Sequence, residues 1–401
     1  MKILYLSNRP PHARSMGGLL IVYHRIRRLL ERGHDVGLSV LYAKGEERYL
    51  AEWESRGIDL CAFPMPEVPT GWRGKVSRLR GGVPHPFHAY KSEAMLRGVG
   101  DMVERGKYEV AVAEFSVMGQ YLHHNPWLPA VRKIISSHQS LAALRYADLP
   151  QMGFRPAEMR EWRRAQRRRR YELELFRSVD RILVFNREER FLLLSRAPDL
   201  HVNVVPCSVD AGYFHPPQHP VSERILLFTG NYIDDSNRDA VLWFAREVWP
   251  KLKRRYPDLR FQVVGPEPSA QMRELARTGS GIEVTGEVDD VRPYLNHARV
   301  YVCPVRKGLG MRMKILEAMA SGIPVVATTL AAKGIPAQVG ENCFLADDPG
   351  IMINCIDLLL NDTPLCAAIA RRARDMVVER FTWEQSVGQL ERIFHDVVTG
   401  G

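Results

Sequence analysis

The sequence predicts an α/β protein made of two Rossmann-like domains, each built on a parallel sheet. Short apolar runs rich in β-branched residues alternate with longer amphipathic stretches, which is typical of βαβ units. This series begins at Lys2 and restarts at Ile225, after an irregular connector that contains Pro216, Pro217 and Pro220. A length of 401 residues suits two domains of ordinary size.

Composition narrows the class of protein. Hydrophobic residues make up 45% of the chain and charged residues 25%, as in ordinary globular proteins. Six scattered cysteines form no Cys-x-x-Cys pair, so we expect buried thiols in a reducing compartment. Residues 1–7 are typical of a strand rather than a signal peptide, and no apolar run approaches the ~20 residues that span a bilayer. We therefore expect a cytoplasmic protein.

The first half opens like a doubly wound nucleotide-binding fold. A strand over 2–6 leads into the turn Gly17-Gly18, an amphipathic helix and a second strand over 37–41. The glycine turn lacks the spacing of the dinucleotide fingerprint, which argues against a nicotinamide enzyme. A simple tight turn is the alternative to a ligand-binding role.

Two later strands of this half end in polar residues. The runs 108–114 and 132–138 close with Glu114 and His138. Ligands of open parallel sheets bind at the carboxyl ends of strands, so His138 is a candidate for donating a hydrogen bond or stabilising charge. A structural histidine is the alternative.

Arginines gather on a helix that we expect over 157–178. They account for much of the net charge of +10 and include Arg160, Arg163, Arg164, Arg167, Arg168, Arg169 and Arg170. Such a cluster favours nucleic acid, an anionic membrane surface or an acidic substrate. The alternative is a solvated helix whose arginines pair, at helical spacing, with Glu158, Glu161, Glu172 and Glu174.

The second half continues the strand–helix alternation. We expect strands at 181–186, 202–205, 225–231, 261–265, 282–288, 301–303 and 325–327, another near 343–345, then two helices and a last helix that opens at 381–383. The predicted domains are residues 1–195 and 196–384.

The most informative stretch is 308–328. Gly308 and Gly310 allow a tight turn, a helix follows from near Met311 to residue 320, and Gly322 and Pro324 end it. The free N–H groups of a helix N-terminus suit phosphate.

The charges at the start of this helix support an anionic ligand. Arg312 and Lys314 stand in its first turn, where the helix dipole disfavours cations. Glu317 shares roughly the face of Lys314 and can accept hydrogen bonds from a ribose diol. The alternative is a solvated basic turn with a surface Lys–Glu pair.

The run Gly-x-Gly-x-Arg-x-Lys-x-Leu-Glu-Ala-Met-Ala-x-Gly-x-Pro-Val-Val-Ala-Thr, from Gly308 to Thr328, resembles the nucleotide-sugar signature of glycosyltransferase family 4. The resemblance implies a retaining enzyme of the GT-B fold, with two facing domains and a C-terminal helix (385–401) that crosses back onto the first. It implies a nucleoside-diphosphate-sugar donor, a glycan or lipid-linked acceptor, and a role in polysaccharide or glycolipid biosynthesis. No cofactor and no catalytic metal are expected.

The resemblance also implies site residues. The catalytic residues would be Arg312, Lys314 and His138. The donor-binding residues would be Gly17, Gly18, Gly230, Asn231, Arg238, Thr285, Gly286, Gly308, Leu309, Gly310 and Glu317. Cations and N–H groups at the departing diphosphate would stabilise the transition state.

The sequence departs from the family pattern at four positions. Asn231 stands where members often carry Arg, and Arg238 is the nearest cation on the helix that follows. Leu309 takes the place of the first of two glutamates eight residues apart, and Cys207-Ser208 replaces Asn-Gly. We interpret these as variation within the family. In the absence of an obvious nucleophilic carboxylate, we expect a front-face displacement.

Three rival interpretations remain open: a nucleotide-sugar-binding protein without transfer, a GT-B enzyme of another reaction such as an epimerase, and a nucleic-acid-binding protein. The acidic pairs at 234–235, 289–290 and 347–348 lack the Asp-x-Asp spacing of metal-dependent transferases. No aromatic interleaving or known module supports nucleic acid. The arginines of 160–170 fit better with a peripheral contact to an anionic membrane, at its inner face.

Overall fold

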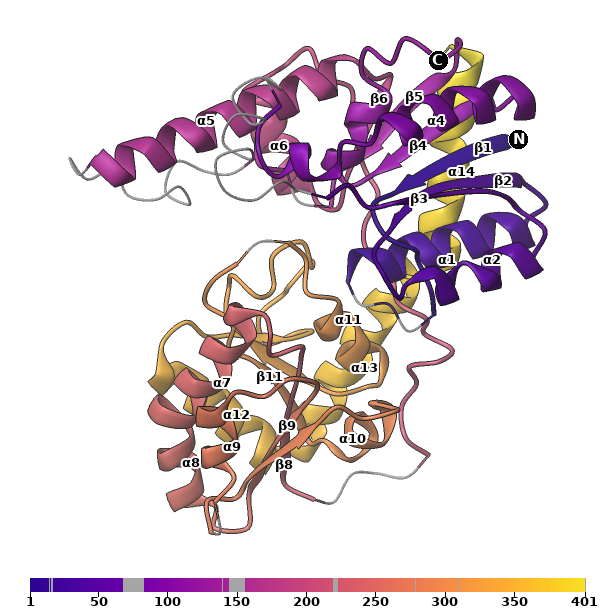
Figure 1. Ribbon diagram of the computed structural model, residues 1–401. Coiled ribbons are helices and arrows are strands. Elements are labelled where there is room, and N and C mark those ends of the chain that lie inside the picture. Colours follow the sequence, from indigo (N-terminus) through magenta and orange to yellow (C-terminus); the bar gives the residue numbers. More distant parts are fainter. Residues whose placement is uncertain are drawn as a thin grey trace. The chain divides into compact units, whose positions relative to one another are not determined.

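The computed structural model describes residues 1–13, 15, 17–67, 83–138, 140–143, 156–218, 223–277, 279–308 and 310–400 (Figure 1). The chain divides into two compact units. Unit 1 comprises Met1–Pro206 and Ser386–Gly401, and unit 2 comprises Cys207–Gln385. The division falls after residue 206 rather than at the predicted 195, because a last short strand of unit 1 pairs with its neighbour at Ile182↔Val202.

Unit 1 is a parallel sheet with helices on both faces. Its described strands run in the order β3-β2-β1-β4-β5-β6-β7. They are β1 (Lys2–Ser7), β2 (Asp35–Tyr42), β3 (Asp59–Pro64), β4 (Val110–Glu114), β5 (Arg132–Ser136), β6 (Arg181–Val184) and β7 (Val202–Val204). Its helices are α1 (Gly18–Glu31), α2 (Ala51–Ser55), α4 (Glu93–Gly106), α5 (Pro156–Arg177) and α6 (Arg187–Leu194), with the short 3₁₀ helices η1 (Glu47–Tyr49), η2 (Phe87–Tyr90) and η3 (Ser116–Tyr121).

The first strand shows how this sheet builds two cores. Alternate side chains of a strand point to opposite faces. Ile3 and Tyr5 of β1 pack with α1, α2 and the C-terminal helix α14 (Trp383–Thr399), whereas Leu4 and Leu6 pack with α4, α5 and α6. Both faces are covered, which explains why the strand is apolar throughout.

Unit 2 repeats this architecture with a different set of helices. Its described strands run in the order β10-β9-β8-β11-β12-β13, all parallel. They are β8 (Ile225–Thr229), β9 (Arg260–Val264), β10 (Ile282–Gly286), β11 (Val300–Cys303), β12 (Val325–Ala327) and β13 (Phe344–Leu345). The helices are α7 (Asp235–Glu247), α8 (Trp249–Arg255), α9 (Ala270–Leu275), α10 (Arg292–His297), α11 (Met313–Ala320), α12 (Pro349–Asn361) and α13 (Thr363–Arg380). Helix α14 begins in unit 2 and ends in unit 1.

Each sheet has one topological switch point, where the strand order reverses direction. It lies between β1 and β4 in unit 1 and between β8 and β11 in unit 2. Crevices outside the carboxyl ends of strands at such points are where open α/β sheets bind ligands. The loops that leave these four strands, together with the helices that follow those loops, carry most of the residues singled out from the sequence.

No single helix among the described residues is long and apolar enough to cross a membrane. Only the pair α12 and α13 meets the length and composition criteria, and only when the two are taken together across a bend of 105°.

Candidate functional site

The carboxyl edge of the unit 2 sheet is lined by glycine backbone. The N–H of Gly230 donates to Val264 O, and the N–H of Gly265 donates to Gly286 O, both at 3.0 Å. A Cβ on Gly265 would lie 1.9 Å from Gly230 O, and its φ of +139° lies in the region that favours glycine. The ends of β8, β9 and β10 are thus held together without intervening side chains.

The loop from β11 to α11 places a cation against a second glycine. Helix α11 begins at Met313 rather than Met311, and Arg312 is its extended N-cap residue. Gly308 has φ +96°, and a Cβ there would lie 2.8 Å from Arg312 Nη2 and 3.5 Å from Ser236 Oγ. Arg312 donates to Lys307 O at 3.1 Å, while its buried Nε and the buried Ser236 Oγ have no hydrogen-bond partner among the described residues. The Arg312 guanidinium and the Ser236 hydroxyl therefore both lie next to the space that Gly308 leaves open by having no side chain.

Lys314 reaches from α11 back to the end of β8. Its Nζ donates to Thr229 O at 2.6 Å and to Asn237 Oδ1 at 2.8 Å, and it lies 4.3 Å from the centre of the Phe228 ring. Burial lowers the pKa of Lys314 to about 8. In the described part of the chain no salt bridge joins either Lys314 or Arg312 to a carboxylate.

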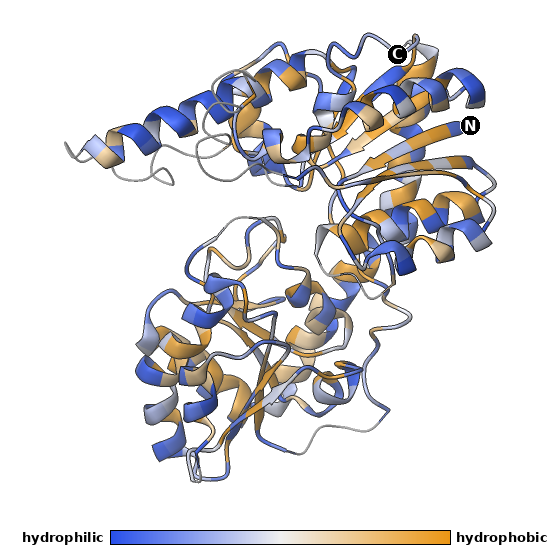
Figure 2. Ribbon diagram, in the orientation of Figure 1, coloured by the Kyte–Doolittle hydropathy of each residue, from blue (hydrophilic) through white to orange (hydrophobic). Residues whose placement is uncertain are grey.

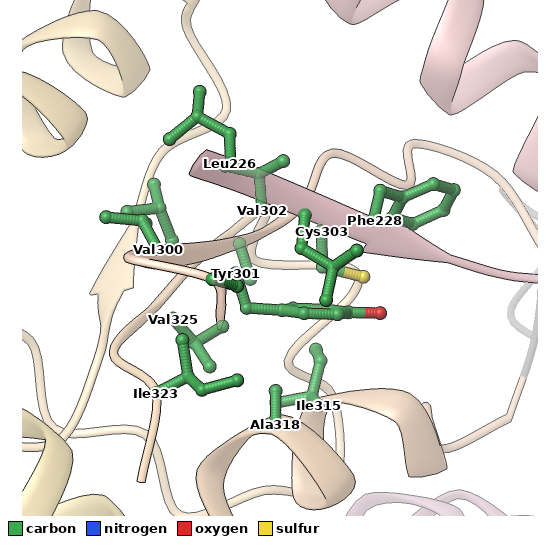
Figure 3. Packing of buried hydrophobic residues seen from close by; sticks show 14 of the residues in the cluster. Leu226, Phe228, Val300, Tyr301, Val302, Cys303, Ile315, Ala318, Ile323 and Val325 are labelled. Atoms are coloured by element: carbon green, nitrogen blue, oxygen red, sulfur yellow. The ribbon is translucent and has the colours of Figure 1, made fainter. Parts of the chain in front are cut away.

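The apolar face of α11 fixes these cations in place. Ile315 and Ala318 pack against Tyr301 of β11 (Figure 3). The Tyr301 hydroxyl contacts Thr229 Oγ1 at 2.8 Å and lies 3.3 Å from Thr229 N. The switch-point strands and α11 therefore pack together around Lys314.

Glu317 lies one turn beyond Lys314 on α11. Its side chain is partly buried, and among the described residues no hydrogen bond satisfies its carboxylate. Burial raises the pKa of Glu317 to about 7, and the nearby Lys314 opposes that rise. The carboxylate is a free acceptor beside a cation, as a ribose-binding role requires.

Unit 1 holds a buried ion-pair network at its own switch point. Arg25 of α1 donates from Nη1 to Glu114 Oε1 at 3.0 Å and to Ser136 Oγ at 2.8 Å. His138 Nε2 lies 2.7 Å from Glu114 Oε2. Burial alone would raise the pKa of Glu114, but Arg25 and the hydrogen bond from His138 outweigh it and lower this pKa to about 2.

The network determines how His138 is held. Its ring stacks on Phe115 with centroids 4.1 Å apart, and a Cβ on Gly18 would lie 2.5 Å from Nδ1. Burial lowers the pKa of His138, although Glu114 opposes this, so the ring is neutral near pH 7 and donates from Nε2 to Glu114. Its Nδ1 is buried beside the start of α1 without a partner among the described residues.

Comparisons with known proteins identify the family. Residues 223–362 match the family described as Glycosyl transferases group 1. The phosphatidyl-myo-inositol mannosyltransferase of Mycolicibacterium smegmatis is 31% identical over 188 residues, which cover 46% of this chain and 48% of the relative. These matches support assignment to a GT-B glycosyltransferase family.

Other comparisons agree with this assignment. The N-acetyl-alpha-D-glucosaminyl L-malate synthase of Bacillus anthracis is 37% identical over 187 residues, or 44% of this chain and 46% of the relative. The chain spans about half the length of these two curated relatives. The structure of Anabaena HepE in complex with UDP-glucose aligns with 99% of this chain and 100% of its own at a TM-score of 0.69 and 14% identity, which shows the shared fold.

Several predicted site residues come together in this GT-B protein. Gly230, Gly308, Arg312, Lys314 and Glu317 surround the unit 2 switch point. Gly310 continues the same turn with φ +86°, and Leu309 lies outside the described residues. In unit 1, Gly18 and His138 are in close approach, and Gly17 (φ +59°) precedes the first turn of α1.

Other predicted site residues form hydrogen bonds or ion pairs with groups close to them in the chain. Arg238 forms an ion pair with Asp235 at 2.9 Å and donates to the carbonyls of Tyr232 and Ile233. Asn231 uses its Oδ1 to accept from Ile233 N at 2.9 Å. The Thr285 hydroxyl donates to Gly286 O on an exposed strand end. Their predicted roles toward a donor remain predictions.

Sequence reasoning missed three residues that the structure brings to these sites. Ser236 and Asn237 of α7 lie beside Arg312 and Lys314, and Arg25 lies with Glu114 behind His138. Glu114 was noted at its strand end but was given no role. The three missed residues reach the sites from neighbouring elements, which spacing along the chain does not reveal.

Among the described residues, no group of three or more His, Cys, Asp or Glu side chains is arranged to hold a metal ion.

Proposed function

We propose that this protein transfers a sugar from a nucleoside-diphosphate sugar to an acceptor hydroxyl with retention of configuration. The observation that carries the proposal is the pair Arg312 and Lys314, which stand at the start of α11 with no salt bridge to a carboxylate among the described residues. Cations at a helix N-terminus are unfavourable unless an anion joins them. A diphosphate supplies two phosphoryl groups for two cations, the Ser236 hydroxyl and the free N–H groups of the helix.

The same residues give the site its chemistry. During transfer the bond between the anomeric carbon and the diphosphate oxygen breaks, while the acceptor oxygen bonds to that carbon on the same face. The acceptor proton passes to the departing diphosphate. Arg312 and Lys314 stabilise the negative charge that develops on the leaving oxygens. Glu317 accepts hydrogen bonds from the ribose. Gly230 and Gly286, at the carboxyl edge of the sheet, have no side chain and so let the nucleotide approach the backbone groups there.

The relatives support this reading. Two matched proteins carry names that denote a mannosyltransferase and a glucosaminyl-malate synthase, and a structural neighbour binds UDP-glucose. We further propose that Arg312 and Lys314 make a catalytic metal unnecessary, so that EDTA leaves the rate of transfer unchanged.

A thermal-shift screen tests donor binding. UDP, GDP, ADP, dTDP and CMP are compared for the wild type, Lys314→Met, Glu317→Ala and the control Lys251→Met, an exposed lysine of α8. A ligand at a hundredfold excess over its Kd stabilises the native state by about 2.7 kcal/mol. We expect a shift with one diphosphate that is reduced in both site variants and retained in the control. No shift with any nucleotide for folded wild type would overturn the proposal.

A second measurement separates transfer from binding alone. The sugar nucleotide of the base that binds is followed by ³¹P NMR in the presence of a lipid and glycan extract. Release of the free diphosphate by wild type but not by Lys314→Met supports transfer. Binding without release in any extract fraction favours a non-catalytic nucleotide-sugar-binding protein.

We also propose that α5 contacts an anionic membrane surface, where a lipid-linked acceptor resides. Arg160, Arg163, Arg167 and Arg170 are exposed and recur at a spacing that places them on one face of the helix. The described residues give these four arginines no acidic partner. Figure 2 shows that most residues of α5 are hydrophilic.

The alternative, a helix neutralised by its own acids, accounts for little of this charge. Of the four glutamates predicted to pair with the arginines, Glu161 pairs with Arg164 and Arg168. Glu172 is instead buried and accepts from Ser140 Oγ at 2.9 Å and from Ala142 N. The exposed arginines therefore keep their charge available for a partner.

Vesicle co-sedimentation tests this contact. Each cation near an acidic bilayer contributes ~1 kcal/mol, so replacing the four arginines by Gln should weaken partitioning ~1000-fold. The control replaces the exposed Arg371 and Arg372 of α13 by Gln. Equal binding to phosphatidylglycerol and phosphatidylcholine vesicles, or no effect of the four substitutions, would refute the contact.

A further inference from the structure

Asn237, on the first turn of α7, lies between the end of β8 and the ammonium of Lys314. We propose that Asn237 is a positioning residue that holds Lys314 toward the diphosphate of the donor without neutralising its charge. This inference rests on the proposed function, because it assumes that Lys314 meets a diphosphate.

The orientation of the Asn237 amide is fixed from both ends. Its Nδ2 donates to Asn231 O at 2.8 Å, so its Oδ1 must face Lys314 Nζ, also at 2.8 Å. Asn237 as a whole is only 7% exposed. A carboxylate here would turn one oxygen toward the Asn231 carbonyl, which can only accept. The site therefore selects an amide over an acid.

The surroundings of the ammonium explain why a neutral acceptor matters. Lys314 Nζ has two acceptors, Thr229 O and Asn237 Oδ1, and both are uncharged. An ammonium has three donors, so one N–H remains for a ligand. Gly230 leaves room on this side, since a Cβ there would lie 2.8 Å from Nζ. An aspartate at 237 would pair with the lysine and compete with the incoming diphosphate.

Other charged and titratable groups act on Lys314. They are Arg312 and Glu317 from its own helix, Cys303 from β11 and Asp234 at the N-cap of α7. None of these donates to or accepts from Nζ among the described hydrogen bonds. Because burial already lowers the pKa of Lys314 to about 8, small changes at position 237 alter its charge within an accessible pH range.

Substitutions at position 237 should move this titration in opposite directions. In Asn237→Ala the charged form loses an acceptor, so the pKa of Lys314 falls further and diphosphate affinity is lost at a lower pH than in the wild type. In Asn237→Asp a carboxylate stabilises the ammonium, so the pKa rises and affinity persists to a higher pH. A residue that only supports the fold would change stability without moving the pH dependence.

The experiment is calorimetric titration of UDP, GDP and ADP from pH 6.5 to 9.5. We expect Asn237→Ala to weaken the diphosphate that binds wild type by about 10-fold or more at pH 7, the range for losing a hydrogen bond to a charged group. We expect Asn237→Asp to bind more weakly at pH 7 as well, with its alkaline loss of affinity displaced upward. Lys314→Met, as reference, should show neither the affinity nor the alkaline loss.

Two controls keep the outcomes distinct. Asn296→Ala removes a partly exposed asparagine of α10 in the same unit and should leave affinity and pH dependence unchanged. Circular dichroism checks that each variant is folded. If Asn237→Ala does not fold, the near-isosteric Asn237→Asp alone tests the role of position 237. If no diphosphate binds wild type, the proposed function itself fails. If wild type binds and both variants match it in affinity and pH dependence, only the role of Asn237 is overturned.

Discussion

Removing one partner of the Arg25–Glu114 pair should destabilise unit 1 severely. Both side chains are almost fully buried, with exposures of 1% and 0%. Replacing Glu114 by Gln leaves the Arg25 guanidinium charged and uncompensated, and breaking a buried pair in this way costs ~3–5 kcal/mol.

The pKa of Glu114 gives a second estimate of this cost. It falls from the ordinary value of 4.5 to about 2 in the folded protein. At ~1.4 kcal/mol per unit, the shift corresponds to ~3 kcal/mol. A lowered folded pKa means that this stability is present above pH 4.5 and is lost as the pH falls toward 2. The two estimates agree in magnitude.

Urea titration read by hydrogen exchange and mass spectrometry reports the two units separately, which is necessary because a protein of two units need not unfold in one step. We expect Glu114→Gln and Arg25→Met each to lower the unfolding free energy of unit 1 by ~3–5 kcal/mol at pH 7 and to leave unit 2 unchanged. The double variant Arg25→Met with Glu114→Met should cost less than the sum of the single variants. Single losses below ~1 kcal/mol, or strict additivity, would refute the buried ion pair.

The remaining predictions concern backbone, burial and metal. Gly265→Ala should destabilise unit 2 by more than the ~1–3 kcal/mol of backbone strain alone, because its Cβ would lie 1.9 Å from Gly230 O. Gly279→Ala is the control for strain alone, since Gly279 has φ +84° and a Cβ there would have no atom within 4 Å. Equal losses of unfolding free energy for the two variants in urea would contradict the clash. Burial raises the pKa of Glu172 from 4.5 to about 7, so the folded protein loses stability as the pH rises through that interval. Glu172→Gln should therefore be up to ~3 kcal/mol more stable than wild type at pH 8 but no more stable at pH 5, and a stabilisation independent of pH would contradict this. Finally, an excess of EDTA over trace metal should leave the rate of diphosphate release unchanged. A rate that falls with EDTA and is restored by added Mg²⁺ would show that a metal takes part.

The architecture was largely predictable because strands buried on both faces have distinctive sequences. The two parallel sheets and the helix at 313–320 follow from apolar runs and glycine spacing, whereas the family came from the resemblance of the run 308–328 to a known signature. Strand β3 was not predicted, since Asp59–Pro64 lies at the sheet edge, mixes polar with apolar residues and ends in proline. The division of the chain after residue 206 is not visible in the sequence for a related reason, because the pairing of β7 is a tertiary contact that a strand of three residues does not reveal.

The candidate site was predictable only in part. The cations of α11 stand in a motif, so the sequence identifies Arg312 and Lys314. Their neighbours Ser236 and Asn237 lie about 75 residues away along the chain and meet them only because β8 and β11 are adjacent in the sheet. For Glu172 the sequence prediction was wrong. Its helical spacing predicts a pair with an arginine, but its side chain faces the core.

The central claim is that Arg312 and Lys314 bind the diphosphate of a donor at the unit 2 switch point. The most direct test measures the Kd of the preferred nucleoside diphosphate and of the matching monophosphate for wild type and Lys314→Met at pH 7. We expect wild type to prefer the diphosphate by ~10-fold or more and the variant to lose most of this preference, since a charged hydrogen bond is worth ~1.5–3 kcal/mol. An equal preference in both proteins would contradict it.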